Sequence, residues 1–306
     1  MDSDGRNKQA IFKTAVNLDS SLHGYDLAGS SLSRDGRRIL LVSWPGKNQE
    51  NRIVWSLNSD GSGLKKHPIG VPNAGWISCL GWTPDSRQAV ILIYENPRKG
   101  ETARPTPWIF RLSPDSGVWQ ALGGNMMGIH LFGMSPAGDR LGYFGLDSSD
   151  PKYPRDILRT IDVETTIETD ILPISGLQQA RWNLEGDQVA FLADNGRRIG
   201  IVSVAEKSVL AERSLEVSKM DRNPWTMDWA DEGQKIVLSD FKDSRFVLRI
   251  FDKAFQNEKV YPLPIDKPLD NYPHVYGLGK KIVVLDFSNS RLWVFDPATE
   301  KWKKLF

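Results

Sequence analysis

A short motif that recurs about every 50 residues limits what this chain can fold into more than any other feature of its sequence. Its clearest copy is Ser33–Arg38, a polar turn built around Asp-Gly, which leads directly into the apolar run Ile39–Val42. The turn glycine, or the residue in its place, recurs at Gly36, Ser86, Gly138, Gly186, Gly233 and Gly279. The spacings are therefore 50, 52, 48, 47 and 46 residues, a period that indicates stacked supersecondary units.

Each unit contains the same succession of four short strands. In the first unit, a strand before the motif is followed by Ile39–Trp44, Arg52–Leu57 and Leu64–Ile69, with polar turns between them. No segment shows a helical period over ten or more residues. A four-stranded sheet cannot bury both of its faces alone, whereas sheets packed radially cover one another and leave only short edges. We therefore expect an all-β fold, a six-bladed β-propeller with four antiparallel strands per blade.

The motif resembles a known family of repeats. Ser33–Ile39, Thr83–Arg87 and Ser135–Gly138 are similar to the TolB-like (WD40-like) propeller repeat, and Trp82 stands before the second copy as that repeat requires. The last three copies lack the proline of the pattern. The resemblance covers residues 20–306 and implies a six-bladed TolB-like propeller. Because the motif is a structural turn, it carries little information about function.

The repeats divide the chain into blades. We expect an N-terminal extension or closing strand over residues 1–19 and one propeller domain over 20–306. The extension contains Gln9–Val16, an additional strand that alternatively belongs to a truncated seventh unit. The chain ends just after its last strand, so we expect no hydrolase domain after the propeller. The expected blades are residues 20–70, 71–123, 124–174, 175–217, 218–265 and 266–306.

Composition excludes several classes of protein. The chain of 306 residues has 39 Lys and Arg against 38 Asp and Glu, so no overall field attracts nucleic acid. Its one cysteine, Cys79, cannot form an intrachain disulfide, and no apolar run is long enough for a membrane span. The polar start Met1–Lys8 is not a signal peptide. We expect a soluble bacterial monomer, periplasmic or extracytoplasmic with its signal removed, with a cytoplasmic location as the alternative.

No catalytic or metal-binding motif stands out. The sequence lacks Gly-x-Ser-x-Gly, a phosphate-binding glycine loop and His-Glu-x-x-His. Of its four histidines, only His23 and His130 are expected near the face where propellers bind ligands, and a catalytic zinc usually needs about three protein ligands. We therefore expect no catalytic residue, no metal and no cofactor, and we regard Cys79 as an inert thiol.

Candidate binding residues come from two places. Strand alternation directs Arg181 and Asp228 toward the central channel from adjacent blades, where they form a structural ion pair or Arg181 holds a ligand carboxylate or phosphate. The second place is the rim formed by the loops between the second and third strands of each unit and by the connections between units. An asymmetric rim of aromatic and arginine side chains is typical of a recognition surface, although tolerated insertions and buried tryptophans are the alternative. The rim candidates are Arg98, Arg104, Tyr153, Arg155, Trp76, Trp225, Tyr272, His130 and His23.

These residues favour a non-catalytic scaffold that binds a protein or peptide through this loop face, as the TolB resemblance implies. The alternative is a carbohydrate-binding protein or a propeller-type lyase or hydrolase that acts at the mouth of the channel. A third possibility is the sensor half of a larger bacterial regulator or receptor.

Overall fold

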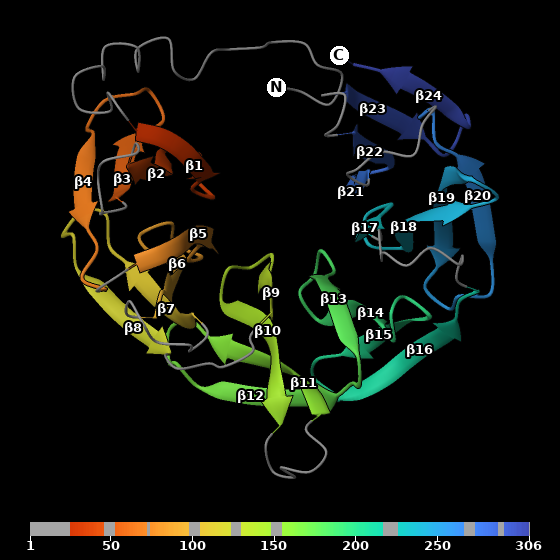
Figure 1. Cartoon of the computed structure of the whole chain (residues 1–306), viewed down its shortest axis with the longest axis horizontal. Coiled ribbons are helices and arrows are strands. Elements are labelled where there is room, and N and C mark those ends of the chain that lie inside the picture. The colour runs from red at the N-terminus through yellow and green to blue at the C-terminus, as the bar shows by residue number, and fades with distance from the viewer. Residues whose placement is uncertain are drawn as a thin grey trace. The chain divides into compact units, whose positions relative to one another are not determined.

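The computed structural model describes residues 25–45, 53–71, 74–97, 105–123, 130–147, 155–216, 226–265, 273–286 and 291–305. In these residues the chain forms strands joined by turns, with no helix (Figure 1). The strands make six antiparallel four-stranded sheets, and each sheet takes its strands in chain order. This confirms the all-β six-bladed propeller that the repeats predicted. No helix that could span a bilayer occurs in the described part of the chain.

The chain divides into two compact units, and the division runs through the third sheet. The N-terminal unit contains the first two sheets and most of β9 and β10. The strands of the first three sheets are β1 (Tyr25–Leu32), β2 (Arg38–Pro45), β3 (Ile53–Asn58), β4 (Lys65–Pro68), β5 (Ala74–Trp82), β6 (Ala89–Glu95), β7 (Thr106–Leu112), β8 (Trp119–Gly123), β9 (His130–Met134), β10 (Arg140–Asp147), β11 (Arg155–Asp162) and β12 (Glu168–Pro173).

The C-terminal unit contains the last three sheets, each within one of the expected repeats. Its strands are β13 (Leu177–Trp182), β14 (Gln188–Ala193), β15 (Arg198–Ser203), β16 (Ser208–Ser214), β17 (Met227–Ala230), β18 (Lys235–Lys242), β19 (Arg245–Asp252), β20 (Glu258–Pro262), β21 (His274–Leu278), β22 (Lys281–Asp286), β23 (Arg291–Asp296) and β24 (Lys301–Lys304). The interpretation of residues 20–306 as one domain remains a prediction. The role of residues 1–19 also remains a prediction, because they lie outside the described residues.

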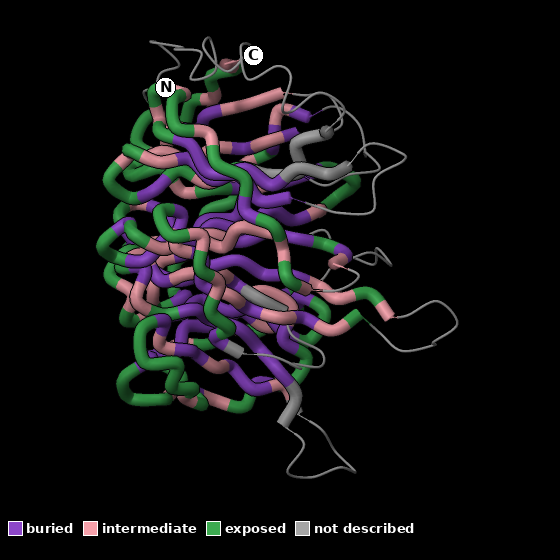
Figure 2. Tube along the Cα trace, turned by 90° about the vertical axis from the view of Figure 1, so that its left-hand side faces the viewer, coloured by how far each residue is buried: buried purple, intermediate pink, exposed green. Residues whose placement is uncertain are grey.

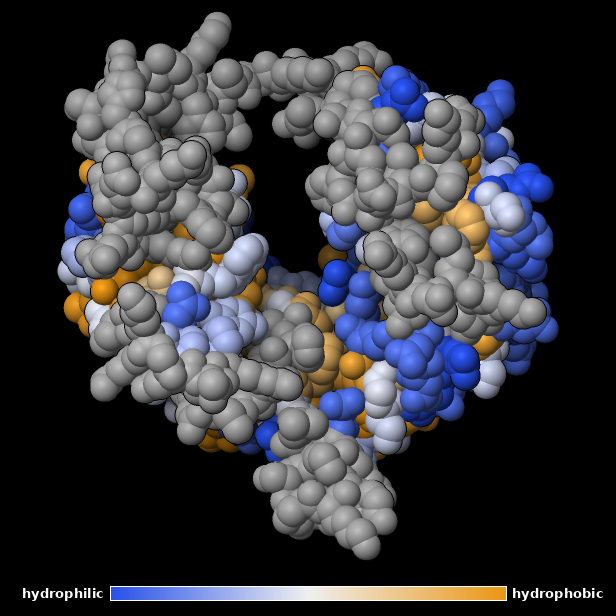
Figure 3. All heavy atoms as spheres, in the orientation of Figure 1, coloured by the Kyte–Doolittle hydropathy of each residue, from blue (hydrophilic) through white to orange (hydrophobic). Residues whose placement is uncertain are grey.

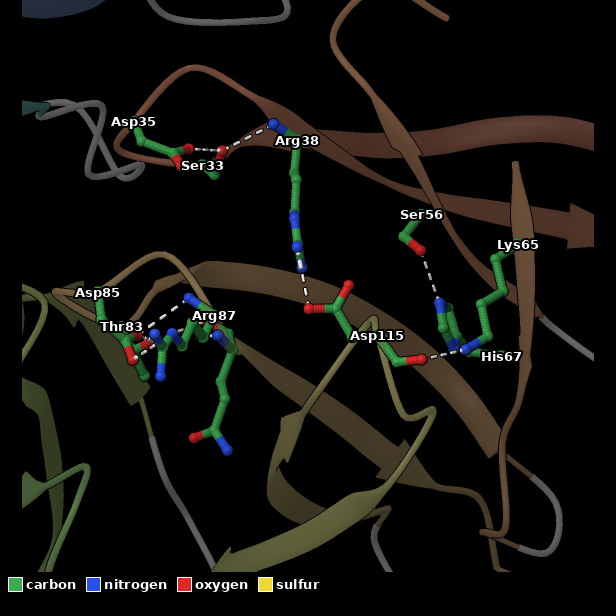
Figure 4. A network of polar contacts seen from close by, with 11 residues as sticks. Ser33, Asp35, Arg38, Ser56, Lys65, His67, Thr83, Asp85, Arg87 and Asp115 are labelled. Carbon is green, nitrogen blue, oxygen red and sulfur yellow. Dashed lines mark hydrogen bonds and ion pairs between the residues drawn. The ribbon is translucent and has the colours of Figure 1, made fainter. Parts of the chain in front are cut away.

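The recurring motif closes the turn between the first and second strands of a sheet. Ser33 Oγ donates to Asp35 Oδ1 at 2.6 Å and accepts from the Arg38 amide at 2.8 Å (Figure 4). Thr83 and Asp85 repeat this arrangement at 2.7 Å. In the fourth sheet, the Asn183 carboxamide oxygen accepts from three amides, those of residues 186, 187 and 188. The side chains thus satisfy backbone groups that a tight turn leaves without partners.

The core lies between neighbouring sheets, because most described residues of the second and third strands are buried or half-buried, and Figure 2 shows buried segments running through the interior. In the N-terminal unit, Leu40 and Val54 of the first sheet pack with Trp82 and Ile91 of the second. Figure 3 shows hydrophilic residues on the outer side of the C-terminal unit, near β16 and β20. The burial pattern of β16 agrees, since most of this outer strand is exposed or half-buried. This gradient from apolar inner strands to polar outer strands is what a propeller blade requires.

Polar contacts also join neighbouring sheets of the C-terminal unit. Thr226 Oγ1 accepts from the Val275 amide at 2.9 Å and donates to the Pro273 carbonyl at 3.2 Å. Trp229 Nε1 donates to the Arg181 carbonyl at 2.9 Å, so the fourth and fifth sheets are tied together in the same way. These bonds hold the first strands of the three sheets in fixed relation to one another.

The sixth unit differs from its sequence interpretation. Counting strand positions back from Gly279, as in the other units, would direct Val275 toward the channel and His274 toward the core. Val275 is instead 2% exposed within a core cluster, whereas Tyr276, two residues after His274, is 41% exposed. The reason is a shorter turn: Leu278 pairs directly with Lys281, so only two residues separate the strands. A one-residue change in register exchanges the two faces of a strand.

Candidate functional site

Arg181 lies on β13, the first strand of the fourth sheet, and its side chain is partly exposed. Its Nη1 donates to the carbonyl of the adjacent residue, Ala180, at 3.0 Å. The guanidinium makes no other hydrogen bond or ion pair with the residues that the structure describes, so the direct ion pair with Asp228 suggested by the sequence is not formed. Most of its donors therefore remain available, which suits an anion-binding group.

Asp228, on β17, is held by backbone amides. Its Oδ2 accepts from Gly277 at 3.0 Å and its Oδ1 from Trp229 at 2.9 Å. Burial raises the pKa of the Asp228 carboxyl, while the two amides and the charge of Arg181 act in the opposite direction. The charge of Arg181 thus acts on the Asp228 carboxyl, although the two side chains form no direct hydrogen bond or ion pair.

His274 and Tyr276, on β21, complete this cluster. Their rings are stacked, with centroids 6.3 Å apart and planes inclined at 23°. Burial lowers the pKa of His274, and the nearby Arg181 charge lowers it further, so His274 is neutral at pH 7. We call Arg181, Asp228, His274 and Tyr276 the inner-strand cluster. All four lie on the first strands of the sheets in the C-terminal unit, and the sequence interpretation missed His274 because of the short turn before β22.

Trp76, a rim candidate, lies near the start of β5 in the N-terminal unit and is 54% exposed. The alternative in which the rim tryptophans are buried therefore does not hold for Trp76. Close by, Trp108 Nε1 donates to Glu95 Oε2 at 3.1 Å, at the same end of the second sheet. An exposed indole at this end can stack on an aromatic, sugar or proline ring.

The other rim candidates cannot be placed. His23, Arg98, Arg104, Tyr153, Trp225 and Tyr272 lie outside the described residues. His130 and Arg155 begin β9 and β11, and only their backbone is described. Their role in binding stays a prediction.

Ser56 and His67 form a hydrogen-bonded pair of the kind found in nucleophilic sites. Ser56 Oγ lies 2.7 Å from His67 Nε2, between β3 and β4 (Figure 4). However, His67 is only 1% exposed, and burial, with a smaller effect of Lys65, lowers its pKa to about 4. A base this weak at pH 7 in a closed position does not activate a serine. The pair is best explained as a buried structural contact.

Cysteine and metal chemistry receive no support from the described residues. Burial raises the pKa of Cys79 to about 11, so its thiol remains protonated and weakly nucleophilic at pH 7. The described part of the chain contains no group of three or more His, Cys, Asp or Glu side chains that could hold a metal ion.

Comparison with known proteins identifies the fold and no narrower relationship. No protein family and no curated protein matches the sequence. An oligogalacturonate lyase solved in complex with manganese matches 90% of this chain and 75% of its own, with 14% identity and a TM-score of 0.61. The propeller domain of the trilobed protease from Pyrococcus furiosus matches 77% and 72%, with 12% identity and a TM-score of 0.52.

TolB from Acinetobacter baumannii matches 79% of this chain, with 11% identity and a TM-score of 0.46. This chain spans 56% of the length of that TolB. Structural matches at identities this low show the fold alone and leave the function open. The six four-stranded sheets and the match to the propeller domain of the trilobed protease together identify the fold of the chain as a six-bladed β-propeller.

Proposed function

We propose that this propeller is a non-catalytic scaffold that binds a protein or peptide partner. One observation carries the proposal: Arg181 presents a partly exposed guanidinium whose one hydrogen bond within the described residues is to Ala180. A planar guanidinium with free donors binds carboxylates in bidentate geometry. The partner would therefore present an Asp or Glu side chain, or a free C-terminus, to Arg181.

The surroundings of Arg181 support an amphipathic segment as partner. Tyr276 adds an exposed aromatic ring to the inner-strand cluster. Aromatic and arginine side chains are enriched among the interface residues that contribute most to binding energy. The rim candidates Arg98, Arg104, Tyr153 and Arg155 would extend this surface. We further propose that the protein is a monomer and is located in the periplasm. Light scattering tests the oligomeric state, and cell fractionation tests the location.

An array of peptides in matched acidic and amide forms tests this proposal. Each Asp or Glu peptide is paired with its Asn or Gln counterpart, and each free C-terminus with its amide. We expect the protein to retain acidic forms, Arg181→Gln to weaken their binding by about tenfold or more, and Arg181→Lys to weaken it less. Arg37→Gln, at the exposed turn between β1 and β2, is the control. Equal retention of acidic and amide forms, or an Arg181→Gln variant that binds normally, would contradict the proposal.

A second candidate function uses the same cluster. The stacked His274 and Tyr276 rings beside Arg181 suit an acidic sugar, because an aromatic face can pack on the ring while the guanidinium holds the carboxylate. Oligogalacturonate and its reduced, neutral counterpart are therefore added to the array. Binding of the acidic sugar alone, removed by Arg181→Gln, would favour this alternative over a peptide. Formation of an unsaturated product would further make the protein a lyase.

A further inference from the structure

A cavity of about 550 Å³ lies between the second and third sheets of the N-terminal unit. Its lining comes from four turns, those joining β5 to β6, β7 to β8, β9 to β10 and β11 to β12. In an antiparallel sheet these turns lie at the end opposite the loops between second and third strands. The cavity therefore lies at the end of these two sheets opposite the connections that the sequence assigns to the rim, and it shares no residue with the inner-strand cluster.

The lining carries an excess of negative charge. The lining holds two guanidinium groups, those of Arg87 and Arg111, and five carboxylates, those of Asp85, Asp115, Asp139, Asp162 and Glu164. In the part of the chain that the structure describes, only Asp115 has a close cation from outside the lining, Arg38 Nη2 at 2.9 Å from its Oδ2. Hydrogen bonds from backbone amides lower the pKa of Asp85 and of Asp162, so both are ionised at pH 7. The cavity thus favours an occupant with positive charge.

Several of these carboxylates keep one oxygen available. The turn donors of Asp85, Asp139 and Asp162 all bind Oδ1. Among the described residues, the Oδ2 atoms of Asp85 and Asp139 make only long ion-pair contacts, with Arg87 Nε at 3.8 Å and with Arg140 Nε at 3.9 Å. The turns therefore fix the carboxylates without using both of their acceptor atoms.

Arg111, on β7, provides an independent sign of a missing partner. It is only 9% exposed, its Nη2 donates to Gln120 Oε1 at 2.6 Å, and its Nε is buried with no partner among the described residues. Arg249, an equally buried arginine on β19, has two carboxylates instead, Asp240 at 2.9 Å and Glu258 at 2.7 Å. Buried guanidinium groups are normally satisfied, so Arg111 lacks an acceptor.

We propose that this cavity binds a short basic peptide segment. A lysine or arginine side chain lies among the carboxylates, and a main-chain carbonyl oxygen accepts from the Arg111 guanidinium. The volume suits a segment of this kind, since ligand cavities typically measure about 300–1,000 Å³. A free anion would accept from Arg111, but the carboxylates of the lining would repel it. A cation with no acceptor atom would leave Arg111 Nε without a hydrogen-bond partner.

Calorimetric titration of the full chain with acetyl-Lys-Lys-Lys-amide tests the proposal. Acetyl-Glu-Glu-Glu-amide and spermidine, a cation without carbonyl groups, serve as comparison ligands. We expect only the lysine peptide to bind well, with affinity that falls as salt is added. Glu164→Gln should weaken binding, while Glu232→Gln, an exposed turn residue in the C-terminal unit, should leave it unchanged.

The Arg111 Nε–H signal in an NMR spectrum provides a readout that needs no core substitution. It should shift when the lysine peptide is added, and Arg111→Gln, if folded, should weaken binding by about tenfold, the scale of one charge-assisted hydrogen bond. Failure of the lysine peptide to bind at millimolar concentration would overturn the proposal. Equally tight binding of spermidine with no movement of the Arg111 signal would overturn the peptide assignment.

Discussion

The backbone amide of Gly277 donates to Asp228 Oδ2 at 3.0 Å, which joins the first strands of the fifth and sixth sheets edge to edge. A Cβ atom at residue 277 would overlap the carbonyl of Trp229 and would lie 3.0 Å from the Cα of Ala230. Only glycine allows the two strands to approach this closely. The hydrogen bond that the Asp228 carboxylate accepts from Gly277 depends on this approach, and it opposes the effect of burial on the pKa of Asp228.

Gly277→Ala should therefore destabilise the protein by about 3 kcal/mol, because overpacking forces the backbone of two sheets apart. Gly70→Ala is the matched control, since a Cβ there meets nothing within 4 Å, and it should change stability by less than about 0.5 kcal/mol. Urea denaturation of both variants measures the difference. Equal stability of the two variants would show that the sheets can separate at low cost.

Asn183→Ala should cost about 2 kcal/mol. The Asn183 side chain is 1% exposed and its Oδ1 accepts from three backbone amides, which alanine would leave without partners. Ser175→Ala, at an exposed turn of the same unit, should be neutral. Thermal denaturation of the two variants tests this, and an unchanged Tm for Asn183→Ala would mean that water replaces the side chain.

Arg249→Met should be strongly destabilising, by about 3–5 kcal/mol, because it removes the guanidinium that lies 2.9 Å from the Asp240 carboxylate, a charge that is only 4% exposed. Adding Asp240→Asn and Glu258→Gln to Arg249→Met removes the negative charges of the two carboxylates that Arg249 contacts. The triple variant should recover part of the lost free energy of unfolding in urea denaturation. A triple variant less stable than Arg249→Met would show that the carboxylates have other essential contacts.

Stability should fall with acid through His67. Its folded pKa of about 4 lies below the ordinary value of 6.5, so the unfolded chain binds this proton more readily than the folded chain. The contribution of neutral His67 is complete above pH 6.5 and is lost as pH falls toward 4. His67→Gln should therefore show a smaller decrease of Tm between pH 6.5 and 4 than the unsubstituted protein. An identical pH dependence would exclude His67 as the group responsible.

Reversing the charges of Arg98, Arg104 and Arg155 together should weaken peptide capture without changing the Tm. The sequence places Arg98 and Arg104 in a long connection on the rim, and Arg155 begins β11 at the end of another. Charges at the edge of an interface mainly affect association rate and its salt dependence, so surface plasmon resonance at two salt concentrations is the measurement. Unchanged capture would remove these loops from the binding surface.

The sequence predicted the architecture because the repeated turn is a local device: Ser33 and Asp35 are two residues apart, and their hydrogen bond needs no distant partner. It also placed Arg181 and Asp228 on the first strands of their units, where they lie on β13 and β17, while their role in binding stays a prediction. His274 was missed because a two-residue turn reverses the faces of β21. The sequence did not predict the cavity around Arg111, because its lining residues, which range from Thr83 to Glu164, are brought together only when two sheets pack.

The strand order within each sheet has a consequence for how this chain reaches its fold. Within each sheet, every strand pairs only with strands next to it in the sequence, so each hairpin closes a short loop at a small cost in chain entropy. Turns fixed by their own hydroxyl and carboxylate groups also need no distant partner. We therefore expect the sheets to form as separate local units, with later sheets added to those already formed, as in repeat proteins.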